Sequence, residues 1–513
     1  MANGTAPKQV KLTSQELKSF LWDAANILRG RIDSGEFKHY IFGLLFFKRL
    51  SDVFEEEYSK MVDKVGKKLA RDEHLYGEIF YIPNGCSWDD ILNTSTNIGE
   101  KINDVFVQIT RANVPRLDGI LDKIDFNDKD RLPDEAVHNL VNHFNMYKLG
   151  SKNVTGDLLG DAYEYLIAQF ADDAGKKGGE FYTPHMVVKL LVQILKPDEH
   201  HSIDDPASGS GGMLITSGQY LKELGKNPHK LFLYGQERVY TTYIIAKMNM
   251  ILHGFNDAKI ARGDTFTEPR HLNPDGSLMK FDIVMANPPW NLDNWMHEVS
   301  NNNGKKTKKD IEDKYNRFIY GRPPAGSADW AWLQHMYASL KPGGRMGIVM
   351  DNGVLFRGGK EGIVRKAFIE NDLVDAVIGL PSNLFANTGS PGCLLICNTK
   401  KPAKRKGRIL FIDASKDFLE GKAQNHLREE DVAKTLKAYE KFESVERYCS
   451  VCELDEIKEN DYNLNISRYV DTTEPEVIVD ISACLDNLKK LEADRTAIDK
   501  KLTVFLKELG FNK

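Results

Sequence analysis

The sequence is poor in cysteine and has no long apolar run. Six cysteines in 513 residues do not indicate a disulfide framework, because a chain of this length buries a large core without covalent staples. Its longest strongly apolar run, Tyr40 to Phe47, is far shorter than the roughly 18 residues that a membrane span needs. The N-terminal stretch MANGTAPKQVKL has no apolar signal core. We therefore expect a soluble, cytoplasmic protein that does not enter membranes.

The sequence also has few residues with the spacing of metal ligands, and its net charge is small. Cys449 and Cys452 have the spacing of half a zinc site, but no second Cys/His pair with ligand spacing follows them. Cys393 and Cys397 lie in an apolar, strand-like run, so we expect no metal site. The formal net charge of -5 does not indicate a nucleic-acid binder, although a local basic patch would be enough for one.

What the sequence does contain is a helical pattern followed by strands alternating with helices. Apolar residues three and four apart predict a helical domain over 1–150 and an amphipathic helix at 155–175. The alternation that follows indicates an α/β domain at 151–424 with a doubly wound, mostly parallel sheet. The last apolar runs are too close for crossover helices, which predicts an antiparallel edge hairpin. The expected strands are 201–206, 231–237, 258–264, 281–287, 344–350, 373–380, 392–398 and 409–415.

The C-terminal region, 425–513, is charged and helical in pattern. Its apolar residues near heptad spacing are Ile481, Leu485, Leu488, Leu491, Ile498, Leu502 and Phe505. Such a helix either docks on its own domain or forms a coiled-coil arm for a partner subunit, and the pattern leaves both open.

A glycine-rich turn, DPASGSGGMLI (205–215), follows the first expected strand and opens a helix. It is not a phosphate-binding P-loop, because no Lys-Ser or Lys-Thr follows the glycines, and it lacks the G-x-G-x-x-G spacing. Glycine turns often serve packing alone, but they also let a ligand approach the backbone at the carboxyl edge of a parallel sheet.

Polar residues end the next strands as well. Glu237 ends the second strand, where a carboxylate can accept both ribose hydroxyls, and Asp264 ends the third, where it can accept from the adenine amine. Either carboxylate alone is often a helix cap. Together with the glycine turn they predict an adenosine-containing ligand.

The fourth strand runs into Asn287, Pro288, Pro289 and Trp290. The Asn287 side-chain oxygen and the Pro288 carbonyl can grip both N–H bonds of an aromatic amine, which favours a pyramidal nitrogen with a free lone pair, while the prolines hold both acceptors rigid. Trp290 offers a stacking face for a base flipped out of a duplex. The plainer alternative is a strand stop with a tryptophan that packs in the core.

These motifs, namely GEFYTPHMVVKLL, DPASGSGGML, GQE, ANPPW, LKPGGRMGIVMDNGVLFRGG and FIDASKDF, resemble the modification subunit of type I restriction-modification systems. The resemblance covers nearly the whole chain. It implies the fold of S-adenosylmethionine-dependent methyltransferases, S-adenosyl-L-methionine as cofactor, and N6 methylation of adenine in DNA. Cytosine-N4 methylation suits the same acceptors. Cytosine-C5 methylation is set aside because no Pro-Cys pair supplies a nucleophile.

By matching positions, the resemblance also assigns residues. Asn287, Pro288, Pro289 and Trp290 match the catalytic motif, although Phe or Tyr is commoner than Trp at position 290. Phe385 matches a second aromatic around the flipped base, or is core. The implied cofactor contacts are Glu180, Phe181, Tyr182, Thr183, Pro184, His185, Ser210, Gly211, Gly212 and Glu237, together with Asp205 and Asp264.

The resemblance further implies partners. A separate specificity subunit would choose the site on double-stranded DNA, in an assembly of two modification subunits with one specificity subunit, and a restriction subunit would cleave. The C-terminal helix would be the docking arm. A basic stretch at 301–310 is a phosphate-contact hypothesis, while charge runs of this kind are usually solvated loops. The rival readings are a protein glutamine N5-methyltransferase and a scaffold that has lost catalysis.

Overall fold

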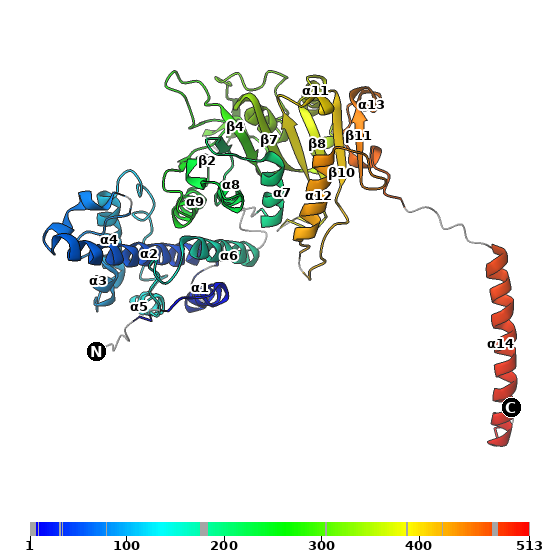
Figure 1. Ribbon diagram of the computed structural model, residues 1–513, viewed down its shortest axis with the longest axis horizontal. Helices are drawn as coiled ribbons and strands as arrows, with labels where there is room; N and C mark the ends of the chain where they lie inside the picture. The colour runs from blue at the N-terminus through cyan, green and yellow to red at the C-terminus, as the bar shows by residue number, and fades with distance from the viewer. Residues whose placement is uncertain are drawn as a thin grey trace. The chain divides into compact units, whose positions relative to one another are not determined.

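The protein has two compact units, Met1–Val470 and Asp471–Lys513. The computed structural model describes residues 7–8, 10–29, 32, 34–77, 79–174, 183–302, 305–385, 388–422, 424–473 and 481–511. Figure 1 shows the N-terminal helices of the first unit in blue to teal, and its sheet, with the helices that cover it, in green to orange.

Helices fill the first part of the chain, as the apolar periodicity predicts. α1 (Ser14–Leu28) begins with a capping box, in which the Thr13 hydroxyl accepts from the Glu16 N–H and the Glu16 carboxylate accepts from the Thr13 N–H. The helices that follow are α2 (Ser34–Val65), α3 (Trp88–Leu92), α4 (Ile98–Ala112), α5 (Asp134–Phe144) and α6 (Gly156–Ala174). Their apolar faces enclose one core that contains Phe42, Phe106 and Tyr163.

A mixed sheet forms the rest of the first unit, with nine strands in the described part of the chain. All eight strands expected from the sequence are present. In sheet order the strands are β11 (Cys449–Glu453), β10 (Arg408–Asp413), β8 (Val374–Gly379), β9 (Gly392–Asn398), β7 (Leu340–Asp351), β4 (Phe281–Ala286), β1 (Ser202–Asp205), β2 (Phe232–Glu237) and β3 (Lys259–Arg262).

Most neighbouring strands are parallel, which confirms the predicted fold class. β7, β4, β1, β2 and β3 run parallel to one another, and β8 is parallel to β10. The predicted antiparallel strand, β9, lies inside the sheet between β7 and β8 and not at its edge. It is enclosed because β8 also pairs with β10 on its other side, and the edge is formed by the antiparallel β10–β11 pair.

Helices cover both faces of the sheet. Successive side chains of β4 point to opposite faces of the pleated sheet, so Ile283 packs in one core and Val284 in the other. The core of Ile283 contains residues of α7 (His185–Leu195), α8 (Gly212–Glu223) and α12 (Glu429–Lys441). The core of Val284 contains residues of α10 (Asp329–Ala338), α11 (Gly359–Glu370) and α13 (Leu454–Glu459). The sheet is therefore doubly wound.

One helix, α9 (Tyr240–Leu252), joins the helical part to the sheet. Ile244 and Met248 pack in the core of the N-terminal helices, while Ala246 and Met250 pack in the core beneath the sheet. The Tyr240 hydroxyl donates to the Gly119 carbonyl at 3.1 Å. The two parts of the first unit thus share a continuous apolar contact.

The sheet continues past residue 424, where the sequence pattern suggested a boundary. α12 packs beneath the sheet and β11 forms its edge strand, so the compact unit extends to Val470. The sequence hides this because α12 is mostly charged and β11 is only five residues long. Cys449 and Cys452 lie on β11 in different cores, on opposite faces of the sheet, so they cannot bind one metal ion together.

A hairpin outside the large sheet and one long C-terminal helix are also present. β5 (His297–Asn302) and β6 (Lys305–Asp310) form an antiparallel hairpin directly after the Asn-Pro-Pro-Trp turn. In the second unit α14 (Ile481–Glu508) is fully exposed, including the predicted apolar stripe. No helix in the described ranges is long and apolar enough to cross a membrane. Short 3-10 turns lie at Leu69–Arg71, Glu73–Tyr76, Pro228–Lys230, Asn352–Leu355, Ala403–Arg405 and Ile466–Arg468.

Candidate active site

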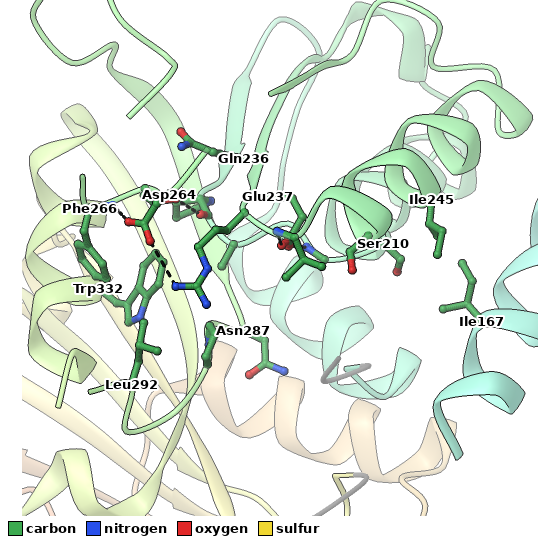
Figure 2. Close-up of a pocket in the computed structure, with 18 residues that line it drawn as sticks. Ile167, Ser210, Gln236, Glu237, Ile245, Asp264, Phe266, Asn287, Leu292 and Trp332 are labelled. Atoms are coloured by element: carbon green, nitrogen blue, oxygen red, sulfur yellow. Dashed lines mark hydrogen bonds and ion pairs between the residues drawn. The ribbon is translucent and has the colours of Figure 1, made fainter. Parts of the chain in front are cut away.

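The polar strand ends come together in one pocket. β4, β1, β2 and β3 are adjacent and parallel, so their carboxyl ends meet at one edge of the sheet. There Glu237, Asp264 and Asn287 line a pocket of about 250 Å³. Figure 2 shows Phe266 and Trp332 toward one end of this pocket, and Ile167 and Ile245 toward the other.

Two backbone N–H groups of the glycine turn donate hydrogen bonds to β2. The Ser208 N–H donates to the Gln236 carbonyl at 3.0 Å, and the Gly209 N–H donates to Glu237 Oε2 at 3.1 Å. Gly209 and Gly211 have φ angles of 51° and 84°, in the left-handed region that favours glycine. Gly211 is the N-cap of α8, so the turn delivers the chain to a helix N-terminus beside the pocket.

The two strand-end carboxylates also hold the local backbone. Glu237 accepts from the Gly209 N–H and, through Oε1, from the Val239 N–H at 2.7 Å. Asp264 Oδ1 accepts from the Phe266 N–H at 3.0 Å, and Asp264 Oδ2 pairs with Arg238 at 3.4 Å. Neither side chain is the N-cap of a helix, and each combines hydrogen bonds to the local backbone with a place in the pocket wall.

Asp205, at the end of β1, is buried below the turn. Only 2% of the residue is exposed, and its carboxylate accepts from the Ala207 N–H at 3.1 Å. The pKa of Asp205 is raised to about 8, chiefly because the carboxyl is buried; the Ala207 hydrogen bond lowers it, and the nearby Glu237 charge raises it. A carboxyl with this pKa is mostly protonated at neutral pH, and a cationic group bound beside it would favour its ionised form.

The raised pKa of Asp205 gives a pH prediction. An acid whose pKa is higher in the folded chain stabilises the fold below its unfolded pKa, and this contribution is lost as the pH rises through the folded pKa. For Asp205 that window runs from 3.8 to about 8. In the ligand-free protein, Asp205→Asn is expected to reduce the fall in melting temperature between about pH 6 and pH 8. Identical pH slopes for variant and parent would contradict it.

The Asn287 amide is fixed at both ends. Its Nδ2 donates to Thr183 Oγ1 at 2.8 Å, and its Oδ1 accepts from the Trp290 indole N–H at 3.1 Å. The same indole N–H lies 3.2 Å from the Val349 carbonyl oxygen on β7. Pro288 is buried and Pro289 exposed. The turn after β4 thus orients the amide through neighbours from two separate segments.

The two predicted stacking aromatics touch each other. The Trp290 and Phe385 rings pack edge to face with centroids 5.0 Å apart, and Phe385 is only 3% exposed. A Cβ at Gly392 would lie 2.8 Å from Phe385 and 3.2 Å from Trp290, so glycine is needed behind the pair. This contact leaves no room for a base between the rings, and the partly exposed Trp290 is the ring that can offer a face.

A buried ion pair braces the turn from behind. Asp329 Oδ1 accepts from the Asn291 N–H at 2.9 Å, and Asp329 Oδ2 binds Arg357 Nη1 at 2.7 Å. Arg357 also binds Asp351 at 2.7 Å. Asn291 has a φ of 53°, so an unusual backbone angle immediately after Trp290 is held by a carboxylate with no solvent exposure.

Breaking this pair should destabilise the protein. Asp329→Asn removes the buried charge that Arg357 Nη1 binds, while Asp351 still binds the guanidinium, so we expect the free energy of unfolding to fall by about 2 kcal/mol. Urea titration measures the change. The matched control is Glu453→Gln, whose exposed pair with Arg408 should contribute under about 1 kcal/mol. Equal losses in the two variants would show that Asp329 braces nothing.

Part of the predicted cofactor segment lies outside the described residues, namely Glu180, Phe181 and Tyr182. Pro184 is the N-cap of α7, and Thr183 and His185 line a second, smaller pocket with Asp205, Ser210 and Gly212. Thr183 also contacts Asn287 directly. The structure therefore brings Thr183 and His185 together with the glycine turn and the catalytic turn.

Several lining residues were not predicted. Arg238 directly follows the acid that ends the second strand, and Phe266 lies two residues after the acid that ends the third. Their place near the pocket could therefore have been predicted from the sequence. Ile167, Ile245 and Trp332 come from α6, α9 and α10, and only tertiary packing brings them to the pocket. In the described part of the chain no group of three or more His, Cys, Asp or Glu side chains is arranged to hold a metal ion.

Comparison with known proteins agrees with this geometry. Residues 154–477 match the N-6 DNA methylase family, and residues 17–144 match the HsdM N-terminal domain. The chain is 35% identical to the type I restriction enzyme MjaVIII methylase subunit of Methanocaldococcus jannaschii, over 99% of this chain and 86% of that protein. It is 34% identical to the HindI methylase subunit of Haemophilus influenzae, over 74% of this chain and 84% of that protein.

Solved structures show the same relationship. The type I restriction-modification methyltransferase subunit from Streptococcus thermophilus matches with a TM-score of 0.75 at 33% identity, over 90% of this chain and 100% of that one. A modification subunit from Vibrio vulnificus has a TM-score of 0.61 at 18% identity, over 91% and 99% of the chains, and shows the shared fold.

The fold and the pocket at the carboxyl edge define a methyltransferase. The chain belongs to the N-6 DNA methylase family, among the methylase subunits of type I restriction enzymes. The resemblance carried by the sequence motifs is thereby confirmed.

Proposed function

We propose that this chain transfers a methyl group from S-adenosyl-L-methionine to N6 of an adenine flipped out of double-stranded DNA. The observation that carries the proposal is the convergence of Glu237, Asp264 and Asn287 on one pocket at the sheet edge. Family membership supports adenine as the base. The intact polar strand ends argue against a scaffold without activity.

The residues present fit S-adenosylmethionine. The glycine turn lets a ligand approach the backbone, Glu237 lies where ribose hydroxyls can donate to it, and Asp264 stands beside the Phe266 ring, which suits a planar base. When bound, the cofactor supplies an electrophilic methyl group. The remaining predicted contacts are Thr183, Pro184, His185, Asp205, Ser210, Gly211 and Gly212, together with Glu180, Phe181 and Tyr182.

Asn287 then acts on the base. Its Oδ1 accepts from the Trp290 indole in this structure, but an amide oxygen has two lone pairs, so it can also accept from the adenine amine. The Pro288 carbonyl accepts the second N–H. Two rigid acceptors favour a pyramidal nitrogen whose lone pair is free for methyl transfer, with little reorganisation on the way to the transition state. The base stacks on Trp290, and Phe385 supports that ring from its side.

The chain works within a larger assembly in this proposal. A specificity subunit chooses the DNA site, two copies of this chain join one specificity subunit, and a restriction subunit carries out cleavage. The exposed apolar stripe of α14 suits subunit docking. The β5–β6 hairpin, which carries the basic stretch 301–310, directly follows the catalytic turn and is proposed to reach DNA phosphates.

The test is a labelling experiment. The purified chain, with and without its specificity partner, is incubated with methyl-labelled S-adenosylmethionine and plasmid DNA. We expect label in DNA, and only when the specificity partner is present. Label that appears on protein alone would favour a glutamine methyltransferase and overturn the proposal.

A further inference from the structure

One motif of the family resemblance, FIDASKDF, has no role in the proposed mechanism. It contains the end of β10 and begins a segment, residues 414–427, that leads to α12. β10 is parallel to β8 (Figure 1), so this segment starts beside the loop at 380–385 that follows β8. The Ala414 N–H donates to the Gly379 carbonyl at 3.1 Å where the two begin. The segment is therefore placed to contact the loop that ends in Phe385, here called the Phe385 loop.

Two consecutive residues of this segment bind three consecutive carbonyl groups of the Phe385 loop. The Gln424 side-chain amide donates to the Leu384 carbonyl at 2.6 Å, and the Asn425 side-chain amide donates to the Ser382 carbonyl at 2.9 Å. The Asn425 backbone N–H donates to the Asn383 carbonyl at 2.8 Å. Carbonyl groups outside helices and strands need other donors, so these three bonds set the shape of the loop.

The loop needs this support because Asn383 has a φ of 53°. The left-handed region is unfavourable for residues other than glycine, although asparagine is among the more tolerant. Asn425 binds the carbonyl group of Asn383 and also that of Ser382, directly before it. Since Asn425 is only 8% exposed, its amide is fixed at the point where the loop turns.

The segment that supplies these donors is itself anchored. Leu419 and His426 exchange backbone hydrogen bonds of 2.8 and 3.0 Å, which closes a backbone loop that contains Gln424 and Asn425. Leu427 then packs in the core beneath the sheet, and α12 follows and packs against α7. The two amides therefore hold the Phe385 loop from a fixed base.

Phe385 connects this loop to the catalytic turn. Its ring packs edge to face against Trp290, and Gly392 leaves room for both rings. Leu384, whose carbonyl binds the Gln424 amide, directly precedes Phe385 in the chain. A shift of the loop therefore moves Phe385 and changes the support of the Trp290 ring.

We propose that Gln424 and Asn425 are positioning residues for the target base. They fix the Phe385 loop so that Phe385 holds Trp290 in the orientation that stacks on the flipped adenine. The inference rests on the proposed function, and it gives the segment after FIDASKDF a role at the base end of the site. Neither Gln424 nor Asn425 lines either of the two pockets described above, so cofactor binding should not depend on them.

The test is single-turnover methyl transfer to DNA by the full chain with its specificity partner. Gln424→Ala and Asn425→Ala are each expected to lower the rate at saturating cofactor by about 3- to 10-fold, because each removes a hydrogen bond that fixes the loop. The cofactor concentration that gives half the maximal rate should stay within about twofold of the parent. Asn93→Ala, which removes an exposed amide-to-carbonyl bond of 2.8 Å at the end of α3, is the matched control and should change neither quantity.

A double-variant cycle shows whether the effect passes through Phe385. Gln424 is used because it is only partly buried, so its replacement should leave the fold intact. Phe385→Ala alone should lower the rate by about tenfold, and adding Gln424→Ala should lower it less than about twofold further, because the side chain that Gln424 positions is already gone.

Three results would overturn the inference while leaving the proposed function in place. They are losses that multiply in the double variant, a raised cofactor requirement in either single variant, and an unchanged rate in both single variants. If the parent chain with its specificity partner does not methylate DNA at all, the proposed function fails as well.

Discussion

Replacement of Asn287 by alanine is expected to lower the rate of methyl transfer to DNA by at least about 100-fold, because one of two acceptors for the adenine amine is lost. The affinity for S-adenosylmethionine should stay within about threefold of the parent, since the proposed contacts to its ribose and adenine come from the ends of other strands, β2 and β3. Thr183 and Trp290 each lose one hydrogen bond to Asn287, but Thr183 stays next to Pro184, the N-cap of α7, and Trp290 keeps its bond to the Val349 carbonyl.

Two measurements separate these effects. Single-turnover transfer of labelled methyl to DNA reports the chemical step, and calorimetry reports cofactor affinity. Asn371→Ala, at the exposed C-cap of α11, is the matched control and should change neither. If Asn287→Ala also abolished cofactor binding, Asn287 would belong to the cofactor site and the division of roles would be wrong.

The second large effect is expected at Glu237. Glu237→Ala removes the proposed acceptor for the ribose hydroxyls and also releases the Gly209 and Val239 N–H groups that shape the turn. We expect the dissociation constant for S-adenosylmethionine to rise by about 100-fold or more, because charge-assisted hydrogen bonds and the geometry of the turn are lost together.

Glu237→Gln distinguishes the two contributions. It keeps one carbonyl acceptor and the side-chain shape but loses the charge, so we expect an intermediate loss of about tenfold. Glu446→Ala, at a side chain that is 88% exposed, serves as the control. A Glu237→Ala variant with unchanged cofactor affinity would remove Glu237 from the site, whatever its effect on methyl transfer.

The place of the site at the sheet edge was predictable from the sequence, because polar residues follow several of the expected strands. Once 281–287 is recognised as a parallel strand beside 201–206, the meeting of Asn287 with the glycine turn follows from the geometry of the sheet. The apolar runs were sufficient to find eight strands of the sheet. β11 was not found, since it is only five residues long and lies between segments with a helical, charged pattern.

The contacts between layers were not predictable. Glu164, which lines the smaller pocket with Asp205, reads as one more polar position on an amphipathic helix, and only the packing of α6 beside α9 brings it there. The mutual contact of Trp290 and Phe385 depends on β9 entering the middle of the sheet, which places Gly392 behind both rings. Periodicity records which face of an element is buried but not what it is buried against.

The β5–β6 hairpin was also missed, although it is local. Its residues, 297–310, are polar and basic and have low strand propensity, so the pattern favours a solvated loop. The hairpin begins at His297, seven residues after Trp290, and the phosphate-contact hypothesis made from charge alone stays a prediction.

The central claim is that Asn287 and its turn direct a methyl group to the exocyclic amine of adenine. The most direct measurement is mass spectrometry of nucleosides from plasmid DNA that has been treated with the chain, its specificity partner and S-adenosylmethionine. The account predicts N6-methyladenine with the parent chain and none above background with Asn287→Ala. N4-methylcytosine as the product, or N6-methyladenine at undiminished level from the variant, would contradict it.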